Sequence, residues 1–352
     1  MNKFRRSLLK TAILSPLLIS GCSSLITSNN NQSKSDILKP KRLKKGSIIG
    51  IVAPATFVPN PDDVEKAIEV IKYFGFEYTF GSTFNTQSSG YRTKEPQIRA
   101  KELNDMFANK NIDGIICIRG GYGSAQILEY LDYGIIKNNP KFFLGYSDIT
   151  ALHLSIFKNT GLITFHGPIL LSKFKDYTAN YLEKILWSDY REIILKNPQE
   201  KDGIRDLYPV RIINDGIAEG RLIGGNLSLI TSLIGTNYLP DFKNSILYLE
   251  EVGESPYRID RMLNQMKMAG LLNNLKGVLI GRCNDCNTNN NQTWDLSLGE
   301  VLDYYIKPLG IPAMYGLMFG HTDEQFTLPN GCLAEIDTGN KSIKLKENFF
   351  VD

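Results

Sequence analysis

The sequence predicts an α/β fold in which an N-terminal domain built on a parallel sheet precedes a second, C-terminal domain of mixed α/β structure. A length of 352 residues accommodates two such domains. From Gly46 onward, short apolar runs alternate with amphipathic stretches of helical spacing. Strands separated by single helices need crossover connections, which produce an open parallel sheet with helices on both faces. After about residue 207, hairpin-like apolar runs predominate, which indicates a second, strand-rich domain.

The N-terminal elements follow in a regular order. The first apolar run, residues 48–53, has the continuous hydrophobicity of a strand that is buried on both faces. The helix after it begins at Asn60-Pro-Asp62, which supplies capping chemistry, and ends at Gly75. The alternation continues with predicted strands at 76–80, 112–118 and 142–146 and predicted helices at 95–109, 124–133 and 148–159. Ligands of such sheets bind at the carboxyl ends of the strands.

The two domains are joined by a less regular segment. Residues 176–206 carry more charge, so we place the linker there, between an N-terminal domain at 46–175 and a C-terminal domain at 207–352. The strands expected in the C-terminal domain are 218–222, 246–252, 277–280, 332–336 and 342–345.

The first 45 residues are predicted to be a signal peptide and a tether. Residues 1–21 begin with basic side chains, among them an Arg-Arg pair that resembles a twin-arginine export signal. The apolar run 8–19 is too short for a membrane-spanning helix and is typical of a signal peptide. It ends in Ile-Ser-Gly-Cys22, which resembles the bacterial lipoprotein processing site. Polar residues 22–45 would then form the tether of an exported lipoprotein on the periplasmic or extracytoplasmic side of the membrane, anchored through Cys22. An uncleaved anchor or a chance cysteine is the alternative.

Charge and cysteine usage argue against nucleic acid and metal binding. The formal charge is +3, but residues 1–21 contribute four positive charges and no acid, so the rest of the chain carries −1. A near-neutral chain offers no broad basic face to nucleic acid. Cys283 and Cys286 have the spacing of half a zinc or redox site, but no second pair accompanies them. We expect no metal, and a local disulfide remains an option in an oxidising compartment.

The first candidate for chemistry is a serine between a strand and a helix. Gly145-Tyr-Ser-Asp148 follows an apolar run and leads directly into a predicted helix. Such a turn exposes the serine hydroxyl at a helix N-terminus, where backbone N–H groups favour negative charge. Ile149 replaces the second glycine of the esterase motif, and a serine at this place can also be a simple helix cap. Ser147 is therefore a candidate nucleophile.

A glycine-rich turn follows the preceding predicted strand. In Arg119-Gly-Gly-Tyr-Gly123, the glycines allow the backbone to approach a ligand closely and to direct N–H groups toward an oxyanion. A flexible turn and a phosphate cradle are the alternatives, although the Lys-Ser/Thr ending of a P-loop is absent.

A serine nucleophile needs a base, and the chain has three histidines. His153 and His166 are interpreted as satisfied structural residues. His321 lies in the polar, glycine-flanked sequence Phe-Gly-His-Thr-Asp, where a base would be accessible. An ordinary surface histidine is the alternative.

The imidazole in turn needs a carboxylate that orients it. A predicted strand ends in Glu250 and Glu251. Side chains alternate along a strand, so only one of the two can face a given side, and we choose Glu250. The alternative is that both acids merely line the edge of the sheet.

Four motifs together resemble the LD-carboxypeptidases, also called muramoyltetrapeptide carboxypeptidases. In chain order they are Arg119-Gly-Gly-Tyr-Gly123, Gly145-Tyr-Ser-Asp-Ile-Thr150, Leu249-Glu-Glu-Val-Gly-Glu-Ser-Pro-Tyr-Arg-Ile-Asp260 and Gly320-His321. The resemblance extends from about Gly46 to the C-terminus. It implies a flavodoxin- or Rossmann-like N-terminal domain, a smaller, swivelling β-rich C-terminal domain, a site between them, and a homodimer.

The resemblance also implies roles for residues of this chain. The implied catalytic triad consists of Ser147 as nucleophile, His321 as base and Glu250 as its orienting partner. Backbone N–H groups of Gly121 and Asp148 would form the oxyanion hole, with Gly120 as the alternative to Gly121. Arg119 is the candidate cation for a substrate carboxylate, and Tyr122 is a second candidate substrate contact. No metal or organic cofactor is implied.

The implied reaction removes the terminal D-alanine from peptidoglycan tetrapeptides through an acyl-enzyme. Family members that recycle wall fragments usually work in the cytoplasm, whereas the signal sequence favours trimming of wall peptides outside it. The alternatives are a non-catalytic lipoprotein that binds peptidoglycan peptides, an esterase or amidotransferase-like hydrolase, and a relative that hydrolyses peptide-nucleotide antibiotics and confers immunity. Cys22 argues against the last, whose substrate would be inside the cell.

Overall fold

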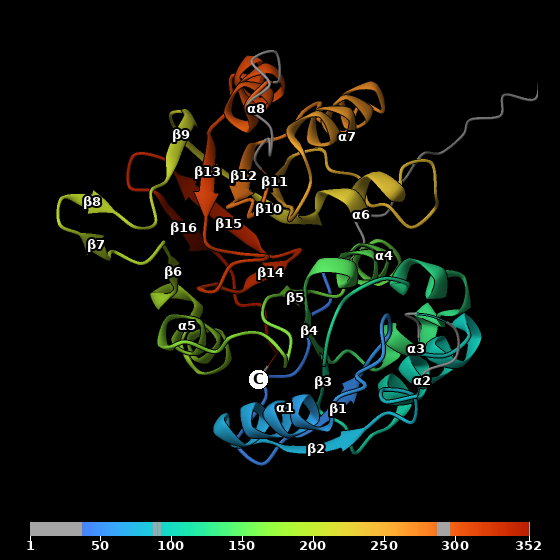
Figure 1. Cartoon of the computed structure of the whole chain (residues 1–352). Helices are drawn as coiled ribbons and strands as arrows, with labels where there is room; N and C mark the ends of the chain where they lie inside the picture. The colour runs from blue at the N-terminus through green and yellow to red at the C-terminus, as the bar shows by residue number, and fades with distance from the viewer. Residues whose placement is uncertain (1–36, 87–89, 91–92, 287–295, 352) are drawn as a thin grey trace, which may run out of the picture. The chain divides into compact units, whose positions relative to one another are not determined.

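A computed structural model of the chain describes residues 37–86, 90, 93–286 and 296–351. The predicted signal peptide 1–21, the candidate lipidation site Cys22 and most of the predicted tether lie outside the described residues. The described chain contains two large sheets, one at the N-terminal side and one at the C-terminal side of the sequence (Figure 1). None of the helices found in this part of the chain has the length and apolar character needed to cross a membrane.

The first sheet confirms the predicted parallel arrangement. Its strand order is β14-β5-β4-β3-β1-β2, and β1 to β5 run parallel. The strands are β1 Ile48–Val52, β2 Glu77–Phe80, β3 Gly114–Cys117, β4 Phe142–Gly145, β5 Thr164–His166 and β14 Leu328–Asn330. The helices of this region are α1 Pro61–Tyr73, α2 Pro96–Ala108, α3 Tyr133–Asn138, α4 Thr150–Thr160 and α5 Asp176–Trp187. Asn60 caps α1 as predicted, because its side chain accepts a hydrogen bond from the N–H of Asp62.

One predicted helix is divided in two. Residues 124–133, expected as a single helix, form the 3-10 helix η1 Ser124–Tyr130, and α3 then begins separately. Leu131 has extended dihedral angles that interrupt the helical path, and the Asp132 side chain caps α3 by accepting from the N–H of Ile135. The helix predicted at 148–159 also differs at its start. The 3-10 helix η2 Ser147–Ile149 precedes α4, so the regular α-helix begins two residues later than expected.

The second sheet is mixed. Its order is β6-β16-β15-β10-β11-β12-β13-β9, with a parallel centre from β10 to β13 and antiparallel strands on both sides. The strands are β6 Ile194–Leu195, β9 Arg211–Asn214, β10 Ile217–Asn226, β11 Ser245–Glu250, β12 Gly277–Gly281, β13 Ala313–Leu317, β15 Leu333–Asp337 and β16 Ser342–Leu345. The remaining elements are α6 Leu227–Ser232, α7 Pro256–Met268, α8 Leu298–Ile306, the 3-10 helices η3 Tyr190–Glu192 and η4 Lys307–Leu309, and a small ribbon of β7 Lys201–Asp202 and β8 Arg205–Asp206.

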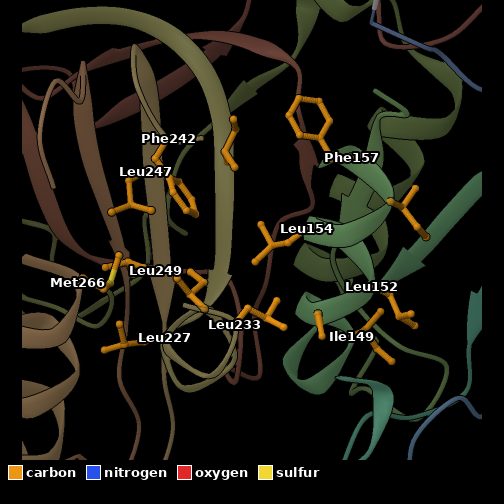
Figure 2. Packing of buried hydrophobic residues seen from close by; sticks show 14 of the residues in the cluster. Ile149, Leu152, Leu154, Phe157, Leu227, Leu233, Phe242, Leu247, Leu249 and Met266 are labelled. Atoms are coloured by element: carbon orange, nitrogen blue, oxygen red, sulfur yellow. The ribbon is translucent and has the colours of Figure 1, made fainter. Parts of the chain in front are cut away.

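A shared hydrophobic core connects the two sheets. Buried side chains of α4 belong to the same cluster as those of β10, β11, α6 and α7. Figure 2 shows Leu152 and Leu154 of α4 on one side of this cluster and Leu247 and Leu249 of β11 on the other. Leu249 directly precedes Glu250, and α4 directly follows the turn of Ser147. This core therefore holds β11, which carries Glu250, in a fixed position relative to α4, which follows Ser147.

Two segments cross the predicted domain boundaries. Strand β14, from the predicted C-terminal domain, pairs antiparallel with β5 and forms the edge of the first sheet. The end of the predicted tether also packs on the fold, because Leu38 exchanges backbone hydrogen bonds with Gly161 and Ile163, and Leu43 is buried. Residues 37–45 are therefore part of the folded region and not of a solvated tether, since their backbone groups and apolar side chains find partners there.

Candidate active site

Ser147 lies on a strained turn between β4 and α4. Its φ is 64°, a left-handed conformation that is uncommon for a residue with a side chain. The turn is held from below, where the carbonyl of Gly145 accepts hydrogen bonds from His153 Nε2 at 2.8 Å and from the N–H of Gly167 at 3.1 Å. Ser147 is partly exposed. The backbone of Ser147 therefore forms the tight turn between a strand and a helix that the sequence predicts.

Three side chains from distant parts of the sequence form a hydrogen-bonded series. His321 Nε2 lies 2.9 Å from Ser147 Oγ, and His321 Nδ1 lies 2.7 Å from Glu250 Oε2. Glu250 is the last residue of β11, and His321 follows β13 in the same sheet. The carboxyl ends of parallel strands in both sheets therefore meet at this place, as expected for ligand sites of parallel sheets.

The hydrogen bonds determine how this series can move a proton. A carboxylate oxygen only accepts, so the Nδ1 of His321 carries the proton that it donates to Glu250. The Nε2 of His321 is then a free acceptor for the hydroxyl of Ser147. The arrangement can deprotonate the serine and leave an imidazolium that the buried Glu250 carboxylate stabilises.

Electrostatics favour the charged form of the imidazole. Burial by itself lowers the pKa of His321, but the hydrogen bond and negative charge of Glu250, with a contribution from Glu251, outweigh burial and raise the pKa above its ordinary value of 6.5. This direction is the one expected of a histidine that must hold a proton during acyl transfer.

Glycine at position 320 is required by the packing around the acid. Gly320 has a φ of 85°, and a Cβ added there would stand 2.6 Å from Glu250 Oε2. A larger residue would displace the carboxylate or the loop. A glycine directly before His321 is therefore needed to leave room for the carboxylate of Glu250.

Glu251 has a different role from Glu250. Its carboxylate accepts hydrogen bonds from the side chain of Asn226 at 3.1 Å and from the backbone and hydroxyl of Ser228 at 2.9 and 2.7 Å. Burial raises the pKa of Glu251, and the Ser228 hydroxyl partly offsets this. Alternation along the strand allows only one of the two acids to face the histidine, and the hydrogen bond to His321 is made by Glu250, the acid chosen from the sequence.

The glycine turn after β3 lies beside the serine. A Cβ on Gly120 would be 3.2 Å from the Cβ of Ser147, and Gly121 has a φ of 112° that favours glycine. Among the described residues, the backbone N–H groups of Gly121 and Asp148 have no hydrogen-bond acceptor. Both donors of the predicted oxyanion hole are therefore available to a substrate oxygen.

Sequence reasoning missed the residues that hold this turn. The buried guanidinium of Arg99, on α2, donates to the carbonyls of Pro54 and Gly123 and to Gln126 Oε1. A lone arginine in an amphipathic helix gives no signal of such a role. The carboxylate of Asp148 also accepts from the N–H of Ser124 at 2.8 Å, which ties the serine turn to the segment after the glycines.

The other predicted substrate contacts lie at the same edge. The guanidinium of Arg119 donates to the carbonyl of Phe57 at 3.2 Å. Tyr122 is 54% exposed, and its N–H donates to Thr56 Oγ1 at 3.2 Å. Both residues adjoin the glycine turn, and their contact with a substrate remains a prediction.

The two remaining histidines, interpreted as satisfied structural residues, are both buried, but only one of them is fully hydrogen-bonded. His153 Nε2 donates to Gly145 and its Nδ1 accepts from Thr164 Oγ1 at 2.8 Å, and burial lowers its pKa to about 4. His166 has no hydrogen-bond partner for either ring nitrogen in the described structure, so the expectation of a satisfied residue is wrong for it. Burial holds the pKa of His166 well below its ordinary value, because a charged ring would have no compensating group there.

The four cysteines that the structure describes, Cys117, Cys283, Cys286 and Cys332, carry free thiols. Cys283 and Cys286 are both unoxidised in the structure. Throughout the described ranges, no group of three or more His, Cys, Asp or Glu side chains is placed to hold a metal ion.

Comparison with known proteins gives a consistent assignment for both halves of the chain. A family model described as LD-carboxypeptidase N-terminal domain matches residues 49–167, and one described as LD-carboxypeptidase C-terminal domain matches residues 219–336. A Bacillus subtilis protein named "Probable murein peptide carboxypeptidase" is 36% identical over 304 residues, which cover 86% of this chain and 93% of that protein. The microcin C7 self-immunity protein MccF of Escherichia coli is 32% identical, with coverage of 87% and 95%.

Solved structures of similar proteins have the same two-part fold. A structure of MccF in complex with glutamyl sulfamoyl guanosine superposes with a TM-score of 0.80 at 28% identity, covering 89% of this chain and all of that chain. The muramoyltetrapeptide carboxypeptidase of Oxalobacter formigenes superposes with a TM-score of 0.72 at 29% identity, covering 85% and 98%. The fold class predicted from the sequence is therefore confirmed.

Proposed function

We propose that the chain, which belongs to the LD-carboxypeptidase family and resembles proteins named as carboxypeptidases, is a serine hydrolase that removes the terminal D-alanine from peptidoglycan tetrapeptides. The observation that carries this proposal is the hydrogen-bonded series from Ser147 through His321 to Glu250. A binding protein without catalysis would not need a serine in a strained conformation beside an oriented imidazole.

The proposed reaction proceeds through an acyl-enzyme. Ser147 Oγ attacks the carbonyl of the L-centre of the diamino acid while His321 Nε2 takes the hydroxyl proton. The developing oxyanion receives hydrogen bonds from the N–H groups of Gly121 and Asp148. His321 then donates its proton to the amine of D-alanine, which leaves. Water, deprotonated by the same imidazole, releases the shortened peptide from Ser147.

The location is proposed from the N-terminal signal. We infer an exported lipoprotein that is acylated at Cys22 and acts on wall peptides outside the cytoplasm. Homodimerisation is proposed from family resemblance alone. Both statements can be checked by fractionating cells for a lipid-labelled protein and by measuring the mass of the purified protein in solution.

We expect the purified protein to convert synthetic tetrapeptides that end in D-alanine into tripeptides. Substrates with diaminopimelate and with lysine at the third position, and digested wall muropeptides, are incubated with the protein and analysed by mass spectrometry. Loss of one alanine from any of them, with free D-alanine as the second product, supports the proposal. Persistence of every tetrapeptide at high protein concentration contradicts it.

A second candidate function follows from the similarity to MccF. The structure of that protein contains glutamyl sulfamoyl guanosine, an aminoacyl sulfamoyl nucleoside, and it superposes on this chain with a TM-score of 0.80. Hydrolysis of aminoacyl sulfamoyl nucleosides together with inactivity on tetrapeptides would favour an immunity-type hydrolase that uses the same residues.

Activity is expected to rise with pH across the titration of His321. The imidazole can act as a base only when it is neutral, and its pKa is raised above 6.5 by Glu250. The acid limb of kcat/KM should therefore be centred above pH 6.5. The stability of the fold should respond to pH in the opposite direction. The ion pair of protonated His321 with Glu250 stabilises the folded protein at low pH, and this stabilisation is lost as pH rises through the pKa of His321 in the folded state. A pH profile of kcat/KM with a midpoint below 6.5 would contradict the prediction.

A further inference from the structure

The parallel strands of the first sheet begin at one edge of the sheet and end at the other. Ser147 and the glycine turn follow the carboxyl ends of β4 and β3, so the proposed reaction takes place at the edge where the strands end. The opposite edge, where β1 to β5 begin, is formed by residues 39–47, 72–76, 109–113, 138–141 and 158–163. None of the steps of the proposed reaction uses this opposite edge.

Basic side chains collect at the edge where the strands begin. The segment 37–47 contains five basic residues and no acid, and it packs on the fold just before β1. Lysines in a last helical turn, such as Lys72 of α1 and Lys158 of α4, complement the helix dipole. The basic residues of 37–47 lie outside every described helix, so their clustering has no such local cause.

A cavity of about 360 Å³ lies among these residues. Its charged lining consists of Lys41, Arg42, Lys44, Lys110, Lys141 and Asp113. The carboxylate of Asp113 accepts a hydrogen bond from the N–H of Ile48 at 2.9 Å, so this acid is engaged by the first residue of β1. The cavity therefore has an excess of positive charge, which favours an anionic ligand.

Lys141 is the buried cation of this cavity. It is 6% exposed, and its ammonium group donates hydrogen bonds to the carbonyls of Asn109 and Ile112. An ammonium group has three N–H donors, so one remains for an anion that enters the cavity. Burial lowers the pKa of Lys141 to about 8, and a bound anion would offset the cost of burying its charge.

The chain that precedes the fold arrives at the same edge. Leu38 exchanges backbone hydrogen bonds with Gly161 and Ile163, just before β5 begins. Residues 23–36 separate Cys22 from the described chain, and a segment of that length spans at most about 50 Å. A lipid on Cys22 would therefore keep the basic residues close to a membrane surface, whereas the orientation of the fold on that surface is left to their charge.

The basic face is defined as Lys41, Lys44, Lys45, Lys110 and Lys141. We propose that the basic face docks on anionic phospholipid headgroups, with a headgroup phosphate in the cavity beside Lys141. Anionic lipids attract clusters of basic residues that lie next to a membrane anchor. Because β1 to β5 run from the basic face toward Ser147, docking directs the catalytic edge away from the bilayer. This orientation rests on the proposed lipid anchor and wall-peptide substrate, whereas headgroup binding is testable without either.

Headgroup binding is tested with the non-acylated polypeptide from Ser23 to Asp352, which contains every residue that the structure describes. Sedimentation is measured with vesicles of phosphatidylcholine and with mixed vesicles of phosphatidylcholine and phosphatidylglycerol. The wild type should bind the mixed vesicles, and added salt should weaken this binding. The variant Lys41→Glu, Lys44→Glu, Lys45→Glu changes three exposed side chains and should bind about a hundredfold more weakly. Its release of D-alanine from soluble tetrapeptides should equal that of the wild type.

The matched control is the variant Lys201→Glu, Lys243→Glu, Lys276→Glu. It changes the net charge by the same amount through exposed lysines in the C-terminal half of the chain, and it should bind within a few-fold of the wild type. Equal losses in both triple variants, or no binding of the wild type to the mixed vesicles, would overturn the proposal. Binding to soluble polyphosphate without binding to vesicles would assign the basic face to an anionic polymer and would also overturn it.

The orientation is tested by hydrogen exchange of the vesicle-bound wild type. Peptides that cover 109–113 and 138–141 should exchange more slowly on mixed vesicles, whereas those that cover 119–123 and 147–150 should be unchanged. Protection of the second pair without the first would place the catalytic edge on the membrane and overturn the proposal. Lys141→Met, checked for folding by its melting temperature, should bind several-fold more weakly. Full wild-type affinity in this folded variant would overturn the placement of a headgroup in the cavity.

Discussion

Ser147→Ala is expected to lower kcat for D-alanine release by about a million-fold, with little change in KM. The variant removes the atom that attacks the carbonyl, and the remaining donors can only bind the substrate. The free energy of unfolding should remain equal or rise slightly, because alanine removes the hydroxyl from a side chain whose hydrogen-bond partner is the partly exposed His321. The measurement is a steady-state assay of D-alanine release, with urea unfolding to follow stability.

The matched control for this variant is Ser155→Ala. Ser155 is buried in α4, and its hydroxyl donates to the carbonyl of Leu152 within the same helix. Its substitution should leave kcat within a few-fold of the wild type. If Ser147→Ala retained a tenth or more of the wild-type kcat, the serine mechanism would be excluded.

Glu250→Gln is expected to lower kcat by about 10⁴-fold. Glutamine removes the charge that stabilises the imidazolium, and its amide can present N–H to His321 and favour the wrong tautomer. Loss of the carboxylate also removes the hydrogen bond and the charge of Glu250, which are the largest contributions that raise the pKa of His321. The acid limb of the residual activity should therefore move to lower pH, as measured by the pH profile of kcat/KM in the variant and the wild type.

Glu251→Gln provides the comparison at the neighbouring position. Glu251 receives hydrogen bonds from Asn226 and Ser228 and makes none to the histidine. We expect its main effect on stability, about 1–3 kcal/mol in the free energy of unfolding, and a much smaller loss of kcat. A larger loss of kcat in Glu251→Gln than in Glu250→Gln would reverse the assignment of the acid.

Local sequence patterns are sufficient to predict the parallel sheet and the turns and strand ends that carry the candidate catalytic residues. Apolar runs that end in polar or glycine turns predict β1 to β4, and strand alternation indicates that only one of Glu250 and Glu251 can face the histidine. Both inferences depend on short-range rules of side-chain direction. The contact of Ser147 with His321, 174 residues apart, was inferred from chemistry and family resemblance.

Features that depend on long-range contacts were not predictable from the sequence. Arg99 sits in an ordinary helix, and only the fold shows that its guanidinium holds the carbonyl of Gly123. The packing of residues 37–45 was missed because their composition is polar and basic, although Leu38 and Leu43 find apolar or backbone partners. The helix expected at 124–133 was divided because Asp132 provides a new cap that competes with its continuation.

Strand β14 has a consequence for the synthesis of the protein. This strand forms the edge of the first sheet beside β5, yet about 160 residues separate the two along the chain. While the ribosome is still adding the intervening residues, β5 has an open edge whose N–H and C=O groups can pair with another nascent chain. The first sheet is therefore completed only after most of the polypeptide has emerged, and a fragment cut at residue 167 would retain this exposed edge permanently.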